Sequence, residues 1–131
     1  MNEIKFRAKN LKGEWEYGYY LEFELCDGEG RCSYIKKDGC QPIKVLKETV
    51  GQFTGLLDRN GKEIYEGDIV ELDYITTTGK HRIGLSFEIK WCTQEGCWVG
   101  WDGFAENTIQ QTHKMFVVKG NIYDNPELIN E

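Results

Sequence analysis

Apolar and polar residues alternate along most of the chain, and this two-residue period is typical of β-strands that bury one face. In residues 14–25 the apolar and aromatic side chains fall on one face: Trp15, Tyr17, Tyr19, Leu21, Phe23 and Leu25. The acidic side chains fall on the other: Glu14, Glu16, Glu22 and Glu24. The same alternation returns in residues 70–74 and 83–91, and we expect a final strand at residues 116–123, so the sequence predicts an all-β protein.

A basic row precedes this acidic row. Lys5, Arg7 and Lys9 alternate with apolar residues that begin at Ile4. If residues 10–13 turn the chain back, the basic row lies opposite the acidic row, and each cross-strand ion pair contributes ~0.2–1 kcal/mol. We therefore expect the two rows to neutralise each other on a solvated face. An acidic docking strip is the alternative interpretation.

The central segment 50–72, VGQFTGLLDRNGKEIYEGDIVEL, contains two bends. Asn60-Gly61 is the dipeptide of a type I′ hairpin turn, in which both central residues have positive φ. At the second bend, Gly67 supplies a left-handed conformation and Asp68 caps free backbone N–H groups. Two successive bends, each followed by a strand, are typical of the corners of a small coiled barrel. The conformation of the backbone explains each of these residues, so none of them indicates a substrate-binding site.

Two further turns follow from the sequence. If residues 93–96 form a four-residue hairpin loop, Cys92 lies opposite Cys97 and Trp91 lies opposite Trp98. We interpret the two tryptophans as a cross-strand core pair, with a base-stacking platform as the alternative. At the C-terminus, Asn125 as N-cap and Pro126 as the first helical residue predict a short helical turn.

Charge and composition restrict the function classes. The net charge is −6 and the isoelectric point is about 5.0, which makes binding to duplex nucleic acid unlikely because that binding needs clustered cations. No segment has the length of a membrane span, and the N-terminal residues do not form a signal peptide. Five cysteines, an odd number, fit a reducing compartment. We expect a cytoplasmic protein with no membrane association.

Three segments carry a family resemblance: IKFRAKN…GEWEYGYY, VGQFTGLLDRNGKEIYEGDIVEL and VVKGNIYDNPEL. Together they resemble the YopX family of phage and prophage proteins. The resemblance implies an all-β fold with a small SH3-like C-terminal barrel packed with an N-terminal β subdomain. We place these at residues 50–131 and 1–49, and leave open one shared core. The resemblance also implies a bacterial host cytoplasm, and it implies no reaction.

Catalytic and metal chemistry depend on the cysteines and histidines: Cys26, Cys32, Cys40, Cys92, Cys97, His81 and His113. No flanking motif prepares a cysteine as a nucleophile. The pairs Cys26/Cys32 and Cys92/Cys97 are spaced at or beyond the limit for a structural zinc site. We therefore expect the thiols to be small buried hydrophobes, and we expect no catalytic residue, cofactor or metal.

The function that these observations favour is a non-catalytic protein-interaction module, a phage or prophage accessory protein that binds a host or phage partner. Polar loops at the ends of a rigid barrel can vary freely, which points to residues 73–82 and 92–103. The expected surface comprises Tyr74, His81, Arg82, Trp98 and Trp101. A nucleic-acid-associated barrel that uses the same residues is the alternative, and a small hydrolase is a more distant one.

Overall fold

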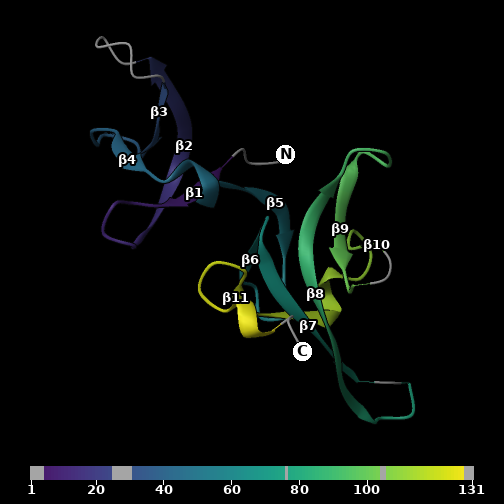
Figure 1. Ribbon diagram of the computed structural model, residues 1–131. Helices are drawn as coiled ribbons and strands as arrows, with labels where there is room; N and C mark the ends of the chain where they lie inside the picture. Colours follow the sequence, from purple (N-terminus) through teal and green to yellow (C-terminus); the bar gives the residue numbers. More distant parts are fainter. Residues whose placement is uncertain (1–4, 25–30, 76, 104–105, 129–131) are drawn as a thin grey trace. The chain divides into compact units, whose positions relative to one another are not determined.

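The computed structural model describes residues 5–24, 31–75, 77–103 and 106–128 of the chain (Figure 1). Eleven strands and three short 3₁₀ helices make up the described residues, so the all-β prediction is confirmed. The chain divides into two compact units, Met1–Phe53 and Thr54–Glu131. Whether each unit is an independent domain, as expected for residues 1–49 and 50–131, stays a prediction. No helix in the described part is long and apolar enough to cross a membrane.

The first unit is an antiparallel sheet with the strand order β4-β3-β2-β1-β5. Its elements are β1 (Phe6–Lys9), β2 (Trp15–Glu24), β3 (Arg31–Lys36), β4 (Ile43–Val45), η1 (Lys47–Thr49) and the start of β5 (Gly51–Leu57). Ala8, Ile35 and Val45 form its buried core, and Phe6 and Tyr20 pack against them. Ile4, Leu25 and Cys26 lie outside the described residues, as does the Glu24 side chain.

The expected pairing of the two charge rows is wrong. Arg7 lies opposite Tyr17, Lys9 lies opposite Trp15, and Ala8 lies opposite Glu16. The turn determines this register, because the Asn10 side chain accepts the N–H groups of Lys12 and Glu14 at 2.8 and 3.0 Å. Odd-numbered residues of β1 therefore face odd-numbered residues of β2. The basic side chains join the aromatic row, and the acidic row shares its face with the core residue Ala8.

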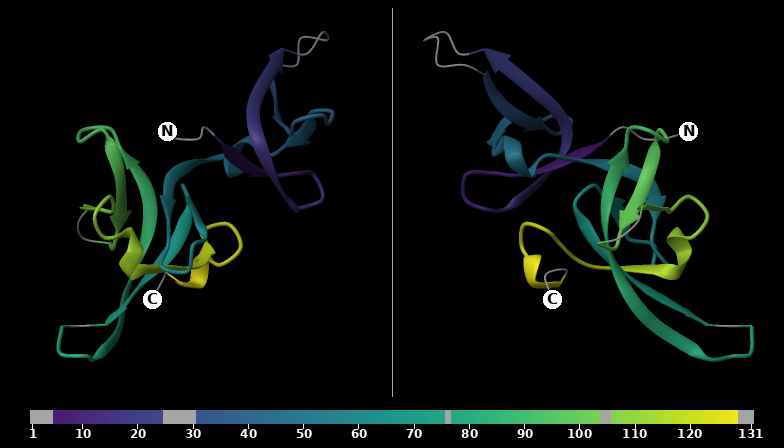
Figure 2. Two further views of the ribbon diagram at one scale, coloured as in Figure 1. Left: turned by 180° about the vertical axis from the view of Figure 1, so that it is seen from behind. Right: turned by 45° about the vertical axis from the view of Figure 1, so that its right-hand side comes forward.

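The second unit contains the rest of β5, β6 (Glu63–Tyr65) and a five-stranded antiparallel sheet of order β10-β9-β8-β7-β11 (Figure 2). That sheet comprises β7 (Asp68–Ile75), β8 (His81–Cys92), β9 (Cys97–Trp101), β10 (Glu106–Thr108) and β11 (Phe116–Asn121). Six buried residues form its core: Ile64, Val70, Phe87, Ile89, Ile109 and Phe116. The described strands form two sheets and no closed barrel.

The first bend of the central segment differs from its prediction. Gly61 has a φ of +83°, but no described non-glycine residue has positive φ, so Asn60 does not adopt a type I′ conformation. Instead, the N–H of Gly61 donates to the carbonyl of Asp58 at 3.0 Å, and the N–H of Asp58 donates to Lys62 at 2.8 Å. This is a type I turn closed by a glycine bulge. Only its glycine needs the left-handed region.

The second bend and the C-terminal turn agree with the sequence. Gly67 has a φ of +89°, and the Asp68 carboxylate accepts the N–H of Tyr65 at 2.8 Å. The 3₁₀ helices η2 (His113–Met115) and η3 (Pro126–Leu128) complete the unit, and η3 confirms the predicted terminal turn. The Asn125 side chain accepts the N–H of Asn121, 3.3 Å away, and thus ties the turn to the end of β11.

Candidate functional site

The hairpin of β7 and β8 extends beyond the other strands of its sheet (Figure 1). It carries three of the five residues expected to form the interaction surface. Tyr74 pairs with Arg82, and Ile75 pairs with His81. The side chains of Tyr74 and Arg82 lie outside what the structure describes. His81 is therefore the member of this group whose contacts can be followed.

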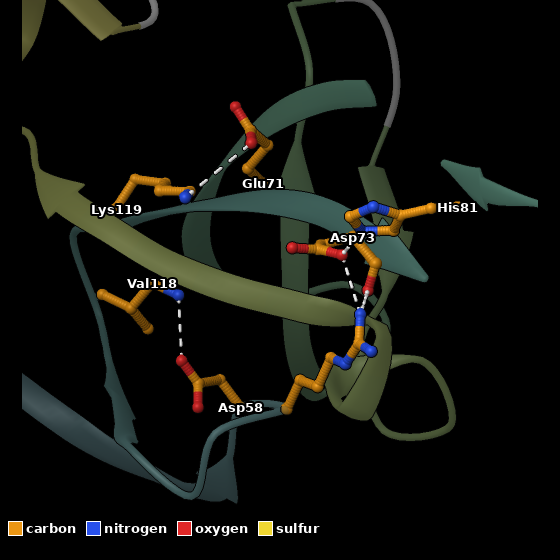
Figure 3. Close-up of polar contacts among 7 residues, drawn as sticks. Asp58, Glu71, Asp73, His81, Val118 and Lys119 are labelled. Carbon is orange, nitrogen blue, oxygen red and sulfur yellow. Dashed lines mark hydrogen bonds and ion pairs between the residues drawn. The ribbon is translucent and has the colours of Figure 1, made fainter. Parts of the chain in front are cut away.

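His81 belongs to a small ionic cluster at the surface (Figure 3). Its Nε2 lies 2.5 Å from Oδ1 of Asp73, and Nη1 of Arg59 lies 2.7 Å from the same oxygen. Nη1 of Arg59 also donates to the Asp73 carbonyl at 3.1 Å. An ionised carboxylate can only accept hydrogen bonds, so the hydrogen between these two atoms is bonded to Nε2 of His81. The cluster ties the turn after β5 to both strands of the hairpin.

The electrostatics of the cluster act on Asp73. The hydrogen bond from His81 lowers the pKa of the Asp73 carboxyl below its ordinary value, and the charges of His81 and Arg59 add to this effect. An aspartate-oriented imidazole also occurs in hydrolytic triads, where a hydroxyl or thiol contacts the other ring nitrogen. Among the described residues, His81 makes no hydrogen bond to a serine, threonine or cysteine. As described, the cluster is an ion-pair network.

Trp98 and Trp101 lie on β9, away from this cluster. Trp98 faces Trp91 across the ladder with ring centroids 5.0 Å apart, and it also packs against the core of the second unit. Lys90 Nζ lies 5.7 Å from the ring centroid of Trp101. Trp91 is ten residues from His81 along β8, which is about 30 Å of extended chain. The five expected residues therefore do not form one patch.

The cysteine arrangement matches the predicted hairpin register, with Cys92 opposite Cys97. Burial, followed by the charges of Cys92, Glu95 and Glu106, raises the pKa of the Cys97 thiol, which makes it a weaker nucleophile. Cys92 is buried and Cys40 is exposed, and Cys26 lies outside the described residues. Within the described ranges, no three His, Cys, Asp or Glu side chains gather as a metal site.

The sequence interpretation missed Asp58, which organises the turn beside the cluster. Its buried carboxylate accepts the N–H groups of Asn60 and Lys62 through Oδ1 at 2.8 and 2.9 Å. Its Oδ2 accepts the N–H of Val118 on β11 at 2.9 Å (Figure 3). An aspartate at the first position of a type I turn, three residues before glycine, is a recognisable signal. No pattern in the sequence near Asp58 indicates its contact with β11, which lies sixty residues further along the chain.

These features define an all-β protein of two small units, with a projecting hairpin held by an ionic cluster. The YopX protein family model matches residues 5–130, so the chain belongs to the YopX family. The crystal structure of protein EF1440 from Enterococcus faecalis is similar, with a TM-score of 0.56 and 26% sequence identity. That similarity covers 98% of this chain and 99% of the other. No curated protein matches the chain.

Proposed function

We propose that this YopX-family chain is a non-catalytic accessory protein of a phage or prophage, which binds a protein partner in the bacterial cytoplasm. The second unit serves as an SH3-like scaffold in this proposal. The observation that carries it is the β7–β8 hairpin, which projects from its sheet and exposes large apolar side chains. Ile75 is 59% exposed and Leu85 is 63% exposed. Rigidly held apolar side chains at a surface are typical of protein interfaces.

Two sets of contacts hold the described part of the hairpin. At the base, Val70 and Phe87 face each other across the ladder, and both belong to the core of the second unit. Further out, the ion pairs from Asp73 to Arg59 and His81 join the two strands to the preceding turn. A preorganised element loses less conformational freedom when it binds. A protein partner therefore meets a surface that is already in its binding conformation.

The alternative of a nucleic-acid site built from the same five residues has less support. The imidazole of His81 is hydrogen-bonded to Asp73, and Trp98 packs against the core. Among the three of these positions whose side chains the structure describes, His81 lies apart from Trp98 and Trp101, so they form no single group of rings and cations. We assign the hairpin to protein recognition.

The test is affinity capture from a bacterial host lysate, with and without nuclease. Ile75→Ser combined with Leu85→Ser should abolish capture of the specific partner, because both apolar contacts are removed from the hairpin. The matched control combines Leu11→Ser with Met115→Ser, which changes side chains that are 64% and 43% exposed elsewhere. A partner that is retained by the hairpin variant, or released by nuclease, would contradict the proposal.

A further inference from the structure

One face of the sheet in the first unit collects aromatic and basic side chains. Directly paired residues of antiparallel strands lie on the same face, so the strand registers define its members. The aromatic and aliphatic members are Trp15, Tyr17, Tyr19, Leu21, Phe23 and Tyr34. The basic members are Arg7, Lys9, Lys36 and Lys44. We refer to this set as the aromatic–basic face.

Three of the five rings of this face are exposed and Trp15 and Tyr34 are half-buried, because the core of the unit forms on the opposite side of the sheet. Tyr17, Tyr19 and Phe23 are 40%, 54% and 49% exposed, respectively. Ala8, Tyr20 and Ile35, which pack together in the core, alternate with the members of the face along their strands. Core packing therefore does not explain this row of large rings. Exposed aromatic groups that lie together usually mark a binding surface.

The rings and the cations are interleaved. Cζ of Arg7, a residue that is only 6% exposed, lies 4.6 Å from the ring centroid of Trp15, and Nζ of the half-buried Lys9 lies 5.5 Å from it. Lys36 pairs with Tyr19, and Lys44 pairs with Tyr34. The rings of Tyr34 and Phe23 meet edge to face at 5.2 Å. A ligand lying along β2 and β3, which pair side by side in Figure 2, would therefore meet a row of rings with Lys36 and Lys44 beside them.

Acidic residues are segregated from this face, although the chain carries a net charge of −6. No acidic residue occupies any of its described strand positions. Glu16 and Glu22 lie on the opposite side, where they pair with Lys37 at 3.1 Å and Lys47 at 3.4 Å. The net charge of the whole chain argues against duplex binding, but the local charge of this face is positive. Charge complementarity selects an anionic ligand here.

We propose that the aromatic–basic face binds single-stranded nucleic acid. Unpaired bases stack on exposed aromatic rings, and lysine or arginine side chains between the rings neutralise the phosphates. The bases of a duplex are stacked on one another, so a duplex can contact the cations through its phosphates but cannot stack on the rings. An acidic peptide also uses the cations, but it has no repeated planar groups to match the row of rings. The proposal concerns the first unit and does not depend on the hairpin of the second.

The test is fluorescence anisotropy of a labelled oligothymidylate titrated with the full chain. We expect a dissociation constant on the order of micromolar at low salt, and weaker binding as salt rises. Tyr19→Ala combined with Phe23→Ala should weaken binding by at least about tenfold, or ~1.4 kcal/mol, because two stacking contacts are lost. Lys36→Gln combined with Lys44→Gln should reduce the slope of log K against log salt by about 1.4.

Matched control variants lie in the second unit. Trp91→Ala removes a ring that is 45% exposed, and Lys62→Gln combined with Lys114→Gln removes two exposed cations. Both controls should bind like the unchanged protein. The proposal is overturned if no binding occurs, if the controls weaken binding as much as the face variants, or if a duplex of equal length binds as tightly. Equal displacement by polyglutamate of matched charge would also overturn it, because any polyanion would then suffice.

Discussion

At the scale of single residues, Asp73 connects geometry to a measurable pH dependence. Its folded-state pKa is lowered, first by the hydrogen bond from His81 and then by the charges of His81 and Arg59. The unfolded value is about 3.9, so the ionised group stabilises the folded state above that pH. This stabilisation is lost as pH falls through the lower folded-state pKa. His81→Ala should raise the Asp73 pKa more than Arg59→Ala does.

Carboxyl NMR titration of the folded protein measures these pKa values directly. Asp73→Asn provides the control for stability. Between pH 5 and pH 2, roughly the window in which a paired carboxylate loses its contribution to stability, the urea midpoint of unfolding should fall less for this variant than for the unchanged protein. An Asp73 carboxyl that titrates at or above its ordinary value would show that the cluster does not persist in solution.

The cluster also shows how much of a site the sequence reveals. His81 stands out because it is one of two histidines and lies in a polar stretch of the sequence. Asp73 lies eight residues before His81 on a different strand, and Arg59 lies fourteen residues before Asp73 in a turn. No periodicity brings such residues together, because their proximity depends on the pairing of β7 with β8 and on where the turn after β5 lies. The chemistry of one side chain was predictable, whereas its ionic partners were not.

At the scale of elements, the two glycine bends of the central segment provide a matched comparison. Gly61 has a φ of +83° and open space around its ideal Cβ position, whereas Gly67 has a φ of +89° and would place a Cβ 3.2 Å from Cε2 of Tyr123. Gly61→Ala should cost about 1–2 kcal/mol from the left-handed backbone alone. Gly67→Ala should cost more, because the Tyr123 ring must also shift. Urea unfolding of both variants measures the difference, and an equal or smaller cost at Gly67 would contradict this account.

The first unit illustrates what alternation can and cannot predict. The two-residue period correctly identified β2 as a strand, and the residues of its two faces were separated correctly. The pattern does not state which face is buried, since both faces carry large side chains. The packing of Ala8 and Ile35 from the neighbouring strands determines that choice, together with the register imposed by Asn10. The aromatic–basic face was therefore visible in the sequence only as an apparent core.

At the scale of the whole molecule, nine of the described buried apolar residues form two core clusters that share no member. The cluster of the first unit has three buried residues, and that of the second has six. The family match spans residues 5–130 and thus includes both clusters. If the clusters stabilise their units separately, the smaller one should support the less stable unit, because less apolar surface is removed from water. The proposed nucleic-acid face belongs to the unit with the smaller core.

Hydrogen exchange can measure this difference when one core is damaged at a time. Ile35 and Ile89 are both fully buried, one in each cluster. Replacing either residue by alanine should cost about 2–5 kcal/mol, because a cavity remains where the side chain packed. Ile35→Ala should speed amide exchange in β1–β4 while β8 and β9 keep their protection, and Ile89→Ala should do the reverse. Equal loss of protection in both units from either substitution would show one cooperative core, and the prediction of two domains would then be wrong.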